Sequence, residues 1–162
     1  MDAKTAIQPA GDPQVGNLAT PLNSSDFSKA FIRNLPAYRA DLSGFRRGLE
    51  VGMAHGYFLF GPFFLLGPLR NSEVAELAGL LSTVGLISIL TIALSIYASA
   101  MGGKPVSTVT TPNPPEELGT KAGWSEFAGG WFVGGCGGAF FAWFLCSTPY
   151  IAQIKDLVNG VG

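Results

Sequence analysis

Two ionisable side chains stand inside the first hydrophobic stretch of the sequence. Glu50 and His55 both belong to LEVGMAHGYFLFGPFFLL, residues 49–66. A carboxylate in apolar surroundings must be paired, protonated or bound to a cation, and Arg46 and Arg47 precede Glu50 closely enough to pair with it. His55 lies about 7.5 Å further along a helix axis, where an imidazole is either a metal ligand or hydrogen-bonded to a neighbouring helix. Each residue is therefore a candidate ligand with a structural alternative.

The rest of the sequence offers little for catalysis. His55 is the only histidine, so this chain alone cannot supply a bis-histidine haem site or a multi-histidine zinc site. The sequence contains no G-x-S-x-G, P-loop or dinucleotide-binding glycine motif, and a net charge of −1 gives no basic field for a nucleic acid. One donor atom does suffice for the magnesium of a chlorophyll, because the ring nitrogens fill its equatorial positions. The inventory favours a non-enzymatic chain.

Glycines recur at four-residue intervals in two of the hydrophobic stretches. The first series, Gly48, Gly52 and Gly56, forms a smooth stripe beside Glu50 and His55. The second series lies in the last stretch and consists of Gly130, Gly134 and Gly138. A stripe of this kind lets another helix or a flat macrocycle approach closely. For the second series, plain helix packing is the favoured interpretation.

Three apolar stretches are long enough to cross a bilayer, which takes about 20 residues. They are residues 49–66, 77–101 and 127–146, and the second contains no charge. We therefore predict an all-α membrane protein with three transmembrane helices, an extended N-terminal segment and a short interfacial helix. Its predicted parts are an N-terminal segment over residues 1–45, a membrane domain over residues 46–158 and a tail over residues 159–162.

The polar parts of the chain have their own pattern. Phe27, Phe31 and Leu35 recur every fourth residue between a serine N-cap at position 24 or 25 and Pro36, which predicts a short amphipathic helix. This helix lies either in the membrane interface or against a soluble partner. Residues 1–23 are rich in Pro, Gly, Asn and Thr and are expected to be extended and ordered only against partners. Residues 102–123 are expected to form an exposed loop.

Lys and Arg residues are unevenly divided between the two sides of this topology. Six precede the first span and two lie between the second and third, whereas only Arg70 and Lys155 lie on the opposite side. The positive-inside rule reads this division directly. The N-terminus is predicted on the inner side of the membrane and the C-terminus on the outer side.

The residues alone leave further function classes open. Glu50 and His55 could form the proton or cation path of a small membrane transporter. The chain could also be an anchor subunit of a respiratory complex that shares one haem with a partner subunit. Bound chlorophyll absorbance would argue against the transporter, and a haem Soret band without red absorption would indicate the anchor.

Several motifs resemble one known family. The run LEVGMAHGYFLFGPF, residues 49–63, and LGPLRNSE, residues 66–73, resemble the photosystem I reaction centre subunit XI family of cyanobacteria and chloroplasts. NLPAYR, residues 34–39, and the glycine-rich third span also match, so that the resemblance covers about residues 11–145. It implies a structural and light-harvesting subunit of the thylakoid membrane. The expected partners are the photosystem I core and small subunits, membrane lipid, and neighbouring photosystem I monomers that this subunit joins.

The resemblance also implies cofactors and their positions. Glu50 and His55 match the residues that are axial ligands of two chlorophyll a molecules in the family, and β-carotene is expected against the helices. A calcium ion is expected at the oligomer interface near Pro68 and Asn71. An aspartate stands at position 71 in trimer-forming relatives, and an amide keeps a donor oxygen without the charge. The chain also resembles tetrameric members at Asn113 to Pro115, so a trimer is favoured with a tetramer as the alternative.

Overall fold

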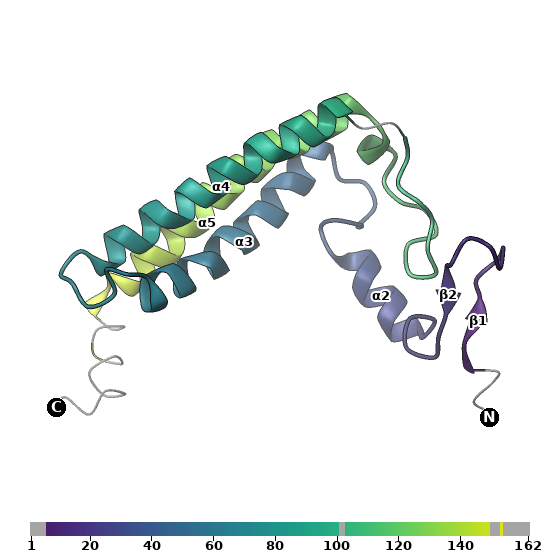
Figure 1. Ribbon diagram of the computed structural model, residues 1–162, viewed down its shortest axis with the longest axis horizontal. Coiled ribbons are helices and arrows are strands. Elements are labelled where there is room, and N and C mark those ends of the chain that lie inside the picture. The colour runs from purple at the N-terminus through teal and green to yellow at the C-terminus, as the bar shows by residue number, and fades with distance from the viewer. Residues whose placement is uncertain (1–5, 101–102, 150–152, 154–162) are drawn as a thin grey trace.

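The computed structural model describes residues 6–100, 103–149 and 153. Three long helices form an extended bundle, and the short N-terminal elements lie to one side of one end of it (Figure 1). In chain order the elements are β1 (Gln8–Pro9), β2 (Leu18–Ala19), α2 (Asp26–Asn34), α3 (Gly44–Leu66), α4 (Ala75–Ala100), η1 (Glu116–Gly119) and α5 (Lys121–Cys146).

The three long helices are the predicted membrane spans. Each is long and apolar enough to cross a bilayer, which confirms the prediction of an all-α membrane protein. All three begin earlier than predicted, at residues 44, 75 and 121. In the first and third helices a polar cap adds a turn before the apolar stretch. Ser43 accepts a hydrogen bond from the Arg46 N–H and Thr120 accepts one from the Gly123 N–H. The end of the second predicted span at Met101, Lys155 and the tail over residues 159–162 lie outside the described residues.

Helices α3 and α5 run parallel and touch along their backbones. An ideal Cβ placed on Gly48, Gly52 or Gly56 would lie within 3.0 Å of a carbonyl oxygen of α5, a distance that real Cβ atoms essentially never show. Gly130, Gly134 and Gly138 meet the carbonyl oxygens of α3 in the same way. Only glycine fits at these positions. The close approach of the two backbones favours weak Cα–H···O bonds between the helices.

The two predicted glycine stripes therefore form one reciprocal contact. The alternative in which a flat macrocycle lies on the stripe of Gly48, Gly52 and Gly56 is wrong, because the backbone of α5 already covers that stripe. The packing interpretation of the second stripe is confirmed by the same contact. We call these six glycines the glycine ladder.

Helix α4 runs antiparallel to α3 and α5 and covers their contact from one side (Figure 1). Its Gly79 packs against Phe64 of α3, and the fully buried Ile87 fills the space beside Gly135 of α5. The hydroxyls of Thr83, Ser88 and Thr91 each donate to the carbonyl four residues earlier, at 2.8 Å. These bonds satisfy polar groups that would be costly to leave unpaired in a bilayer.

The N-terminal segment contains the predicted short helix. Ser25 caps α2 by accepting a hydrogen bond from the Ser28 N–H at 3.1 Å, and the helix ends before Pro36. The rings of Phe27 and Phe31 stack with centroids 6.3 Å apart and are largely exposed. The expectation for residues 1–23 is wrong in part, since β1 and β2 pair with each other as an antiparallel hairpin.

The connection between α4 and α5 also differs from the prediction. It is not simply an exposed loop, since Thr111 and Leu118 are buried and η1 interrupts it. The Trp124 indole N–H donates to the Leu118 carbonyl at 2.6 Å. On the other side, the Arg33 guanidinium donates to the Thr110 carbonyl at 3.3 Å. These contacts join the loop to both α2 and the bundle.

Candidate functional site

Glu50 lies near the start of α3 and is held by two arginines. The Arg39 Nη2 donates to Glu50 Oε2 at 2.5 Å, and the Arg46 Nε donates to Oε1 at 3.3 Å. The Glu50 side chain is 27% exposed. The ion-pair interpretation of Glu50 is thus correct, with Arg39 as the nearer partner. A carboxylate offers about four lone-pair sites, so these two bonds leave room for a further ligand contact.

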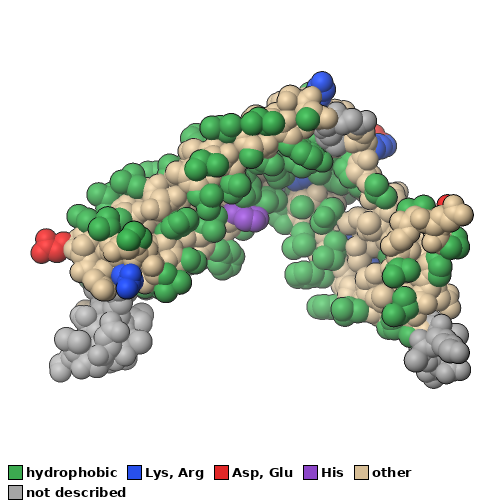
Figure 2. Space-filling model, viewed as in Figure 1, with side chains coloured by type: hydrophobic (Ala, Val, Ile, Leu, Met, Phe, Trp, Pro, Cys, Tyr) green, Lys and Arg blue, Asp and Glu red, His purple; other side chains and the backbone are tan. Residues whose placement is uncertain are grey.

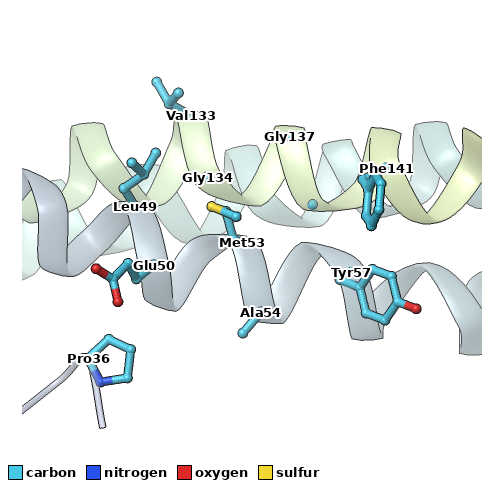
Figure 3. Close-up of a pocket in the computed structure, with 11 residues that line it drawn as sticks. Pro36, Leu49, Glu50, Met53, Ala54, Tyr57, Val133, Gly134, Gly137 and Phe141 are labelled. Atoms are coloured by element: carbon cyan, nitrogen blue, oxygen red, sulfur yellow. The ribbon is translucent and has the colours of Figure 1, made fainter. Parts of the chain in front are cut away.

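A groove of about 770 Å³ begins at this carboxylate and runs along the contact of α3 and α5. Glu50 and Pro36 mark one end of it, and Tyr57 and Phe141 mark the other (Figure 3). Gly137 faces the groove, and a Cβ added there would meet no atom within 4 Å. The groove is therefore open and apolar along its length, and at one end it has a carboxylate oxygen that can bind a metal.

His55 lies on another face of α3 and is exposed. Its Nδ1 is 2.8 Å from the Val51 carbonyl oxygen, and because a carbonyl can only accept, Nδ1 must carry the hydrogen. In the neutral ring this leaves Nε2 with a free lone pair. Trp131 of α5 supports the ring, with centroids 4.8 Å apart. Figure 2 shows the His55 side chain on the surface, on the side of the bundle that faces the N-terminal segment.

Glu50 and His55 do not form one site. Five residues of helix place them about 140° apart around α3, and the glycine ladder lies outside that arc, against α5. Within residues 6–100, 103–149 and 153, no group of three or more His, Cys, Asp or Glu residues could hold a metal ion. Each of the two residues can supply one donor atom to a metal whose other ligands come from elsewhere. This donor set fits a magnesium tetrapyrrole at each position.

Arg47, which the sequence suggested as a partner of Glu50, instead has a structural role. Its side chain is 2% exposed, and it donates to the carbonyls of Pro36 and Arg39 at 2.8 Å and of Leu42 at 3.1 Å. It also forms a two-bond contact with Glu117 Oε1, at 2.6 and 3.0 Å. Arg47 therefore ties the segment before α3 and the loop before α5 to the bundle.

The sequence carried no signal for this burial. Position 47 is about 100° from Gly48 and about 140° from Gly52 around α3, so it lies off the face that carries the ladder. A buried guanidinium needs several acceptors. Its acceptors could not be named from the sequence, because all of them lie outside α3.

The predicted calcium residues lie on the turn between α3 and α4. Pro68 and Asn71 are both exposed, at the end of the bundle opposite Glu50. The Arg70 N–H donates to the Gly67 carbonyl at 3.1 Å and the Ser72 N–H to the Leu69 carbonyl at 3.0 Å, which fixes the turn. Among the described residues, no acidic cluster lies with Pro68 and Asn71, so calcium binding there stays a prediction.

Comparisons with known proteins agree with this architecture. Residues 5–151 match the family model described as photosystem I reaction centre subunit XI. The chain is 66% identical over 149 residues to the photosystem I reaction center subunit XI of Crocosphaera subtropica, which covers 92% of this chain and 96% of that protein. It is 71% identical over 140 residues to that of a Picosynechococcus species, with 86% and 92% coverage. Its identity to that of Synechococcus elongatus is 58% over 161 residues, with 98% and 97% coverage.

These matches decide between the function classes left open by the residues alone. The relatives carry the name of a reaction centre subunit, so the transporter and respiratory-anchor alternatives are set aside, and the prediction of a non-enzymatic subunit is confirmed. Three helices that can span a membrane agree with a multi-pass location. The chain belongs to the photosystem I reaction centre subunit XI family, and it is a multi-pass, non-enzymatic subunit of photosystem I in the thylakoid membrane.

Proposed function

We propose that this subunit binds two chlorophyll a molecules, with His55 and Glu50 as their axial ligands. The observation that carries the proposal is the His55 ring. Its Nδ1 is fixed by the Val51 carbonyl, which leaves Nε2 as a donor directed away from its own helix. A backbone hydrogen bond of this kind orients metal-binding histidines in many proteins. Chlorophyll bound here would add light absorption, and the protein would supply position and orientation.

The outer faces of the helices support the second part of the proposal, which is carotenoid binding. Phe58 of α3 and Phe140 and Phe144 of α5 are more than half exposed. In a bilayer these rings face apolar molecules, and β-carotene is a long apolar molecule that can lie along such a surface. Lipid chains would cover the remaining surface.

We further propose that the subunit joins photosystem I monomers, with a trimer favoured and a tetramer as the alternative. The turn between α3 and α4 is exposed at one end of the bundle, with Leu66 and Leu69 beside Pro68 and Asn71. A backbone carbonyl and an amide oxygen can contribute to a calcium site when further oxygens come from neighbouring copies. Sedimentation of the detergent-solubilised complex through a gradient distinguishes trimer from tetramer, and a calcium chelator in the gradient tests the ion.

The charges of the chain support one orientation in the membrane. The starts of α3 and α5 lie at one end of the bundle, and these starts carry Arg46, Arg47 and Lys121. By the positive-inside rule we propose that this end is cytoplasmic or stromal and that the C-terminus is lumenal. Core and small subunits of photosystem I are the proposed partners of the segment around α2.

The experiment for the pigment site replaces His55 in the assembled complex. His55→Leu is expected to remove or displace one chlorophyll while the subunit remains in photosystem I. His55 is exposed, and within the part of the chain that the structure describes its side chain hydrogen-bonds only to its own helix. Low-temperature absorption difference spectra and a cryo-electron-microscopy map of the complex measure this. His55→Gln is the control, since its amide keeps a donor oxygen. Unchanged pigment density and absorption in His55→Leu would refute the assignment.

A further inference from the structure

The Glu50 site poses a problem of charge. A carboxylate that coordinates a magnesium tetrapyrrole brings a negative charge to a metal centre that is already neutral as a whole. Beside an apolar groove this charge is costly unless a cation stands next to it. Arg39 and Arg46 are the two cations in contact with Glu50, and the structure separates their roles.

Arg39 is the closer and better held of the two. Its Nη2 lies 2.5 Å from Glu50 Oε2, and its side chain is 35% exposed, whereas Arg46 lies at 3.3 Å with 66% of its side chain exposed. The Arg39 backbone is itself fixed, because its carbonyl accepts a hydrogen bond from the buried Arg47 at 2.8 Å. Arg46 is an exposed i,i+4 partner, and such pairs contribute little.

We propose that Arg39 is a positioning residue for the pigment held by Glu50. Figure 3 shows the Glu50 carboxylate at one end of the groove. The Arg39 guanidinium fixes the rotamer of this carboxylate and offsets its charge, so that a free lone pair is available to the metal. This inference rests on the proposed function of Glu50 as a ligand. Arg39 is the last residue of NLPAYR, residues 34–39. The inference therefore gives this motif, which lies before α3, a role in pigment binding.

A purely structural role for the ion pair would be to attach residues 35–43 to α3. Arg47 already provides that attachment through the carbonyls of Pro36, Arg39 and Leu42. These bonds go to backbone atoms and survive when the Arg39 side chain is changed. Removal of the guanidinium is therefore expected to leave the segment in place.

The test is made on the purified photosystem I complex that carries variants of this chain. Arg39→Leu is expected to displace one chlorophyll or to shift its absorption band, with the subunit still assembled. Arg39→Leu combined with Glu50→Gln is expected to restore the pigment density, because a neutral amide keeps a donor oxygen and needs no adjacent cation. Arg33→Leu is the matched control, since Arg33 donates to the loop carbonyl of Thr110 and not to Glu50.

The outcomes separate this inference from the proposal on which it rests. If Glu50→Leu keeps all pigments, Glu50 is no ligand and the proposed function fails at this site. If Glu50→Leu loses a chlorophyll but Arg39→Leu keeps the same density and band, Arg39 has no positioning role. If Arg39→Leu loses the pigment and the double variant Arg39→Leu with Glu50→Gln does not restore it, the inference is also overturned. Should Arg39→Leu not assemble, Arg39→Lys replaces it and must retain the pigment with a shifted band, and an unshifted band counts against the role.

Discussion

Neighbouring glycines of α5 offer a sharp test of the helix packing, because they face opposite environments. A Cβ on Gly138 would overlap the Met53 carbonyl of α3, whereas a Cβ on Gly137 would meet nothing within 4 Å. Both changes to alanine gain about 1 kcal/mol of helix propensity. We therefore expect Gly138→Ala to destabilise the bundle and Gly137→Ala to leave it unchanged or slightly more stable.

The magnitude follows from the ladder. The Met53 carbonyl is backbone and cannot rotate away, so the two helices must separate by about 1 Å, which forfeits up to about half of each dispersion contact at the interface. Six Cα–H···O contacts at about 0.5 kcal/mol each would weaken together by up to about 3 kcal/mol. After the gain in propensity, the net loss is about 2 kcal/mol. For a chain of this size that corresponds to a fall in Tm of about 4–8 °C.

Thermal unfolding of the purified chain in detergent micelles, followed by circular dichroism, measures the difference. The comparison between the two variants cancels the propensity term and any general effect of a methyl group in a membrane helix. Equal Tm values, or a lower Tm for Gly137→Ala than for Gly138→Ala, would refute the close backbone contact of α3 with α5.

Other predictions concern the polar end of the bundle. Arg47→Met is expected to lower the free energy of unfolding by about 3–5 kcal/mol, because it leaves Glu117 and several carbonyls without their buried donor. Limited proteolysis of the loop over residues 103–120 should become faster in this variant. An unchanged rate of cleavage would contradict the structural role of Arg47. Lys104 donates to Glu116 at 2.7 Å and holds the pKa of that carboxyl below its ordinary value of 4.5. The stabilisation from this pair is therefore complete above about pH 4.5 and is lost as the pH falls through the lowered pKa. Carboxyl NMR titration should show the Glu116 pKa rising in Lys104→Gln, and an unaltered value would exclude the pairing.

The membrane helices were predictable because span length and hydrophobicity are local properties of the chain. Their starts were misplaced for an equally local reason, since Ser43 and Thr120 cap turns whose residues are polar. The helix around Phe27 and Phe31 was also within reach, because an N-cap, a four-residue period and a proline delimit it. What covers its exposed apolar face is a question about a partner, and the chain alone does not contain the answer.

The candidate site was predictable in its residues and less so in its contacts. Glu50 and His55 stand out because ionisable groups are expensive in an apolar stretch. Of the two arginines expected near Glu50, Arg46 does contact it, but Arg47 turns to Glu117, because the segment before α3 and the loop before α5 enclose its side chain. The nearer partner, Arg39, is 11 residues away from Glu50 in the chain. Such a contact depends on how the segment folds back, which periodicity does not encode.

The glycine stripes show a similar limit. A period of four residues reveals a smooth helix face but does not say whether a pigment or a helix lies against it. The structure answers this through a second smooth face at matching heights on α5. The two series could have been paired from the sequence by noting that the first and third spans must run in the same direction.

The reciprocal meshing of α3 and α5 also acts as a length standard. Each glycine of the ladder lies against a carbonyl of the other helix, so axial sliding of a fraction of a turn would drive backbone into backbone along the whole contact. Glu50 and His55 both lie on α3. A tilt of α3 therefore moves their two metal-binding atoms together. The distance between two ligands bound by Glu50 and His55 is consequently set by the rise of the α3 backbone and not by the mobility of side chains.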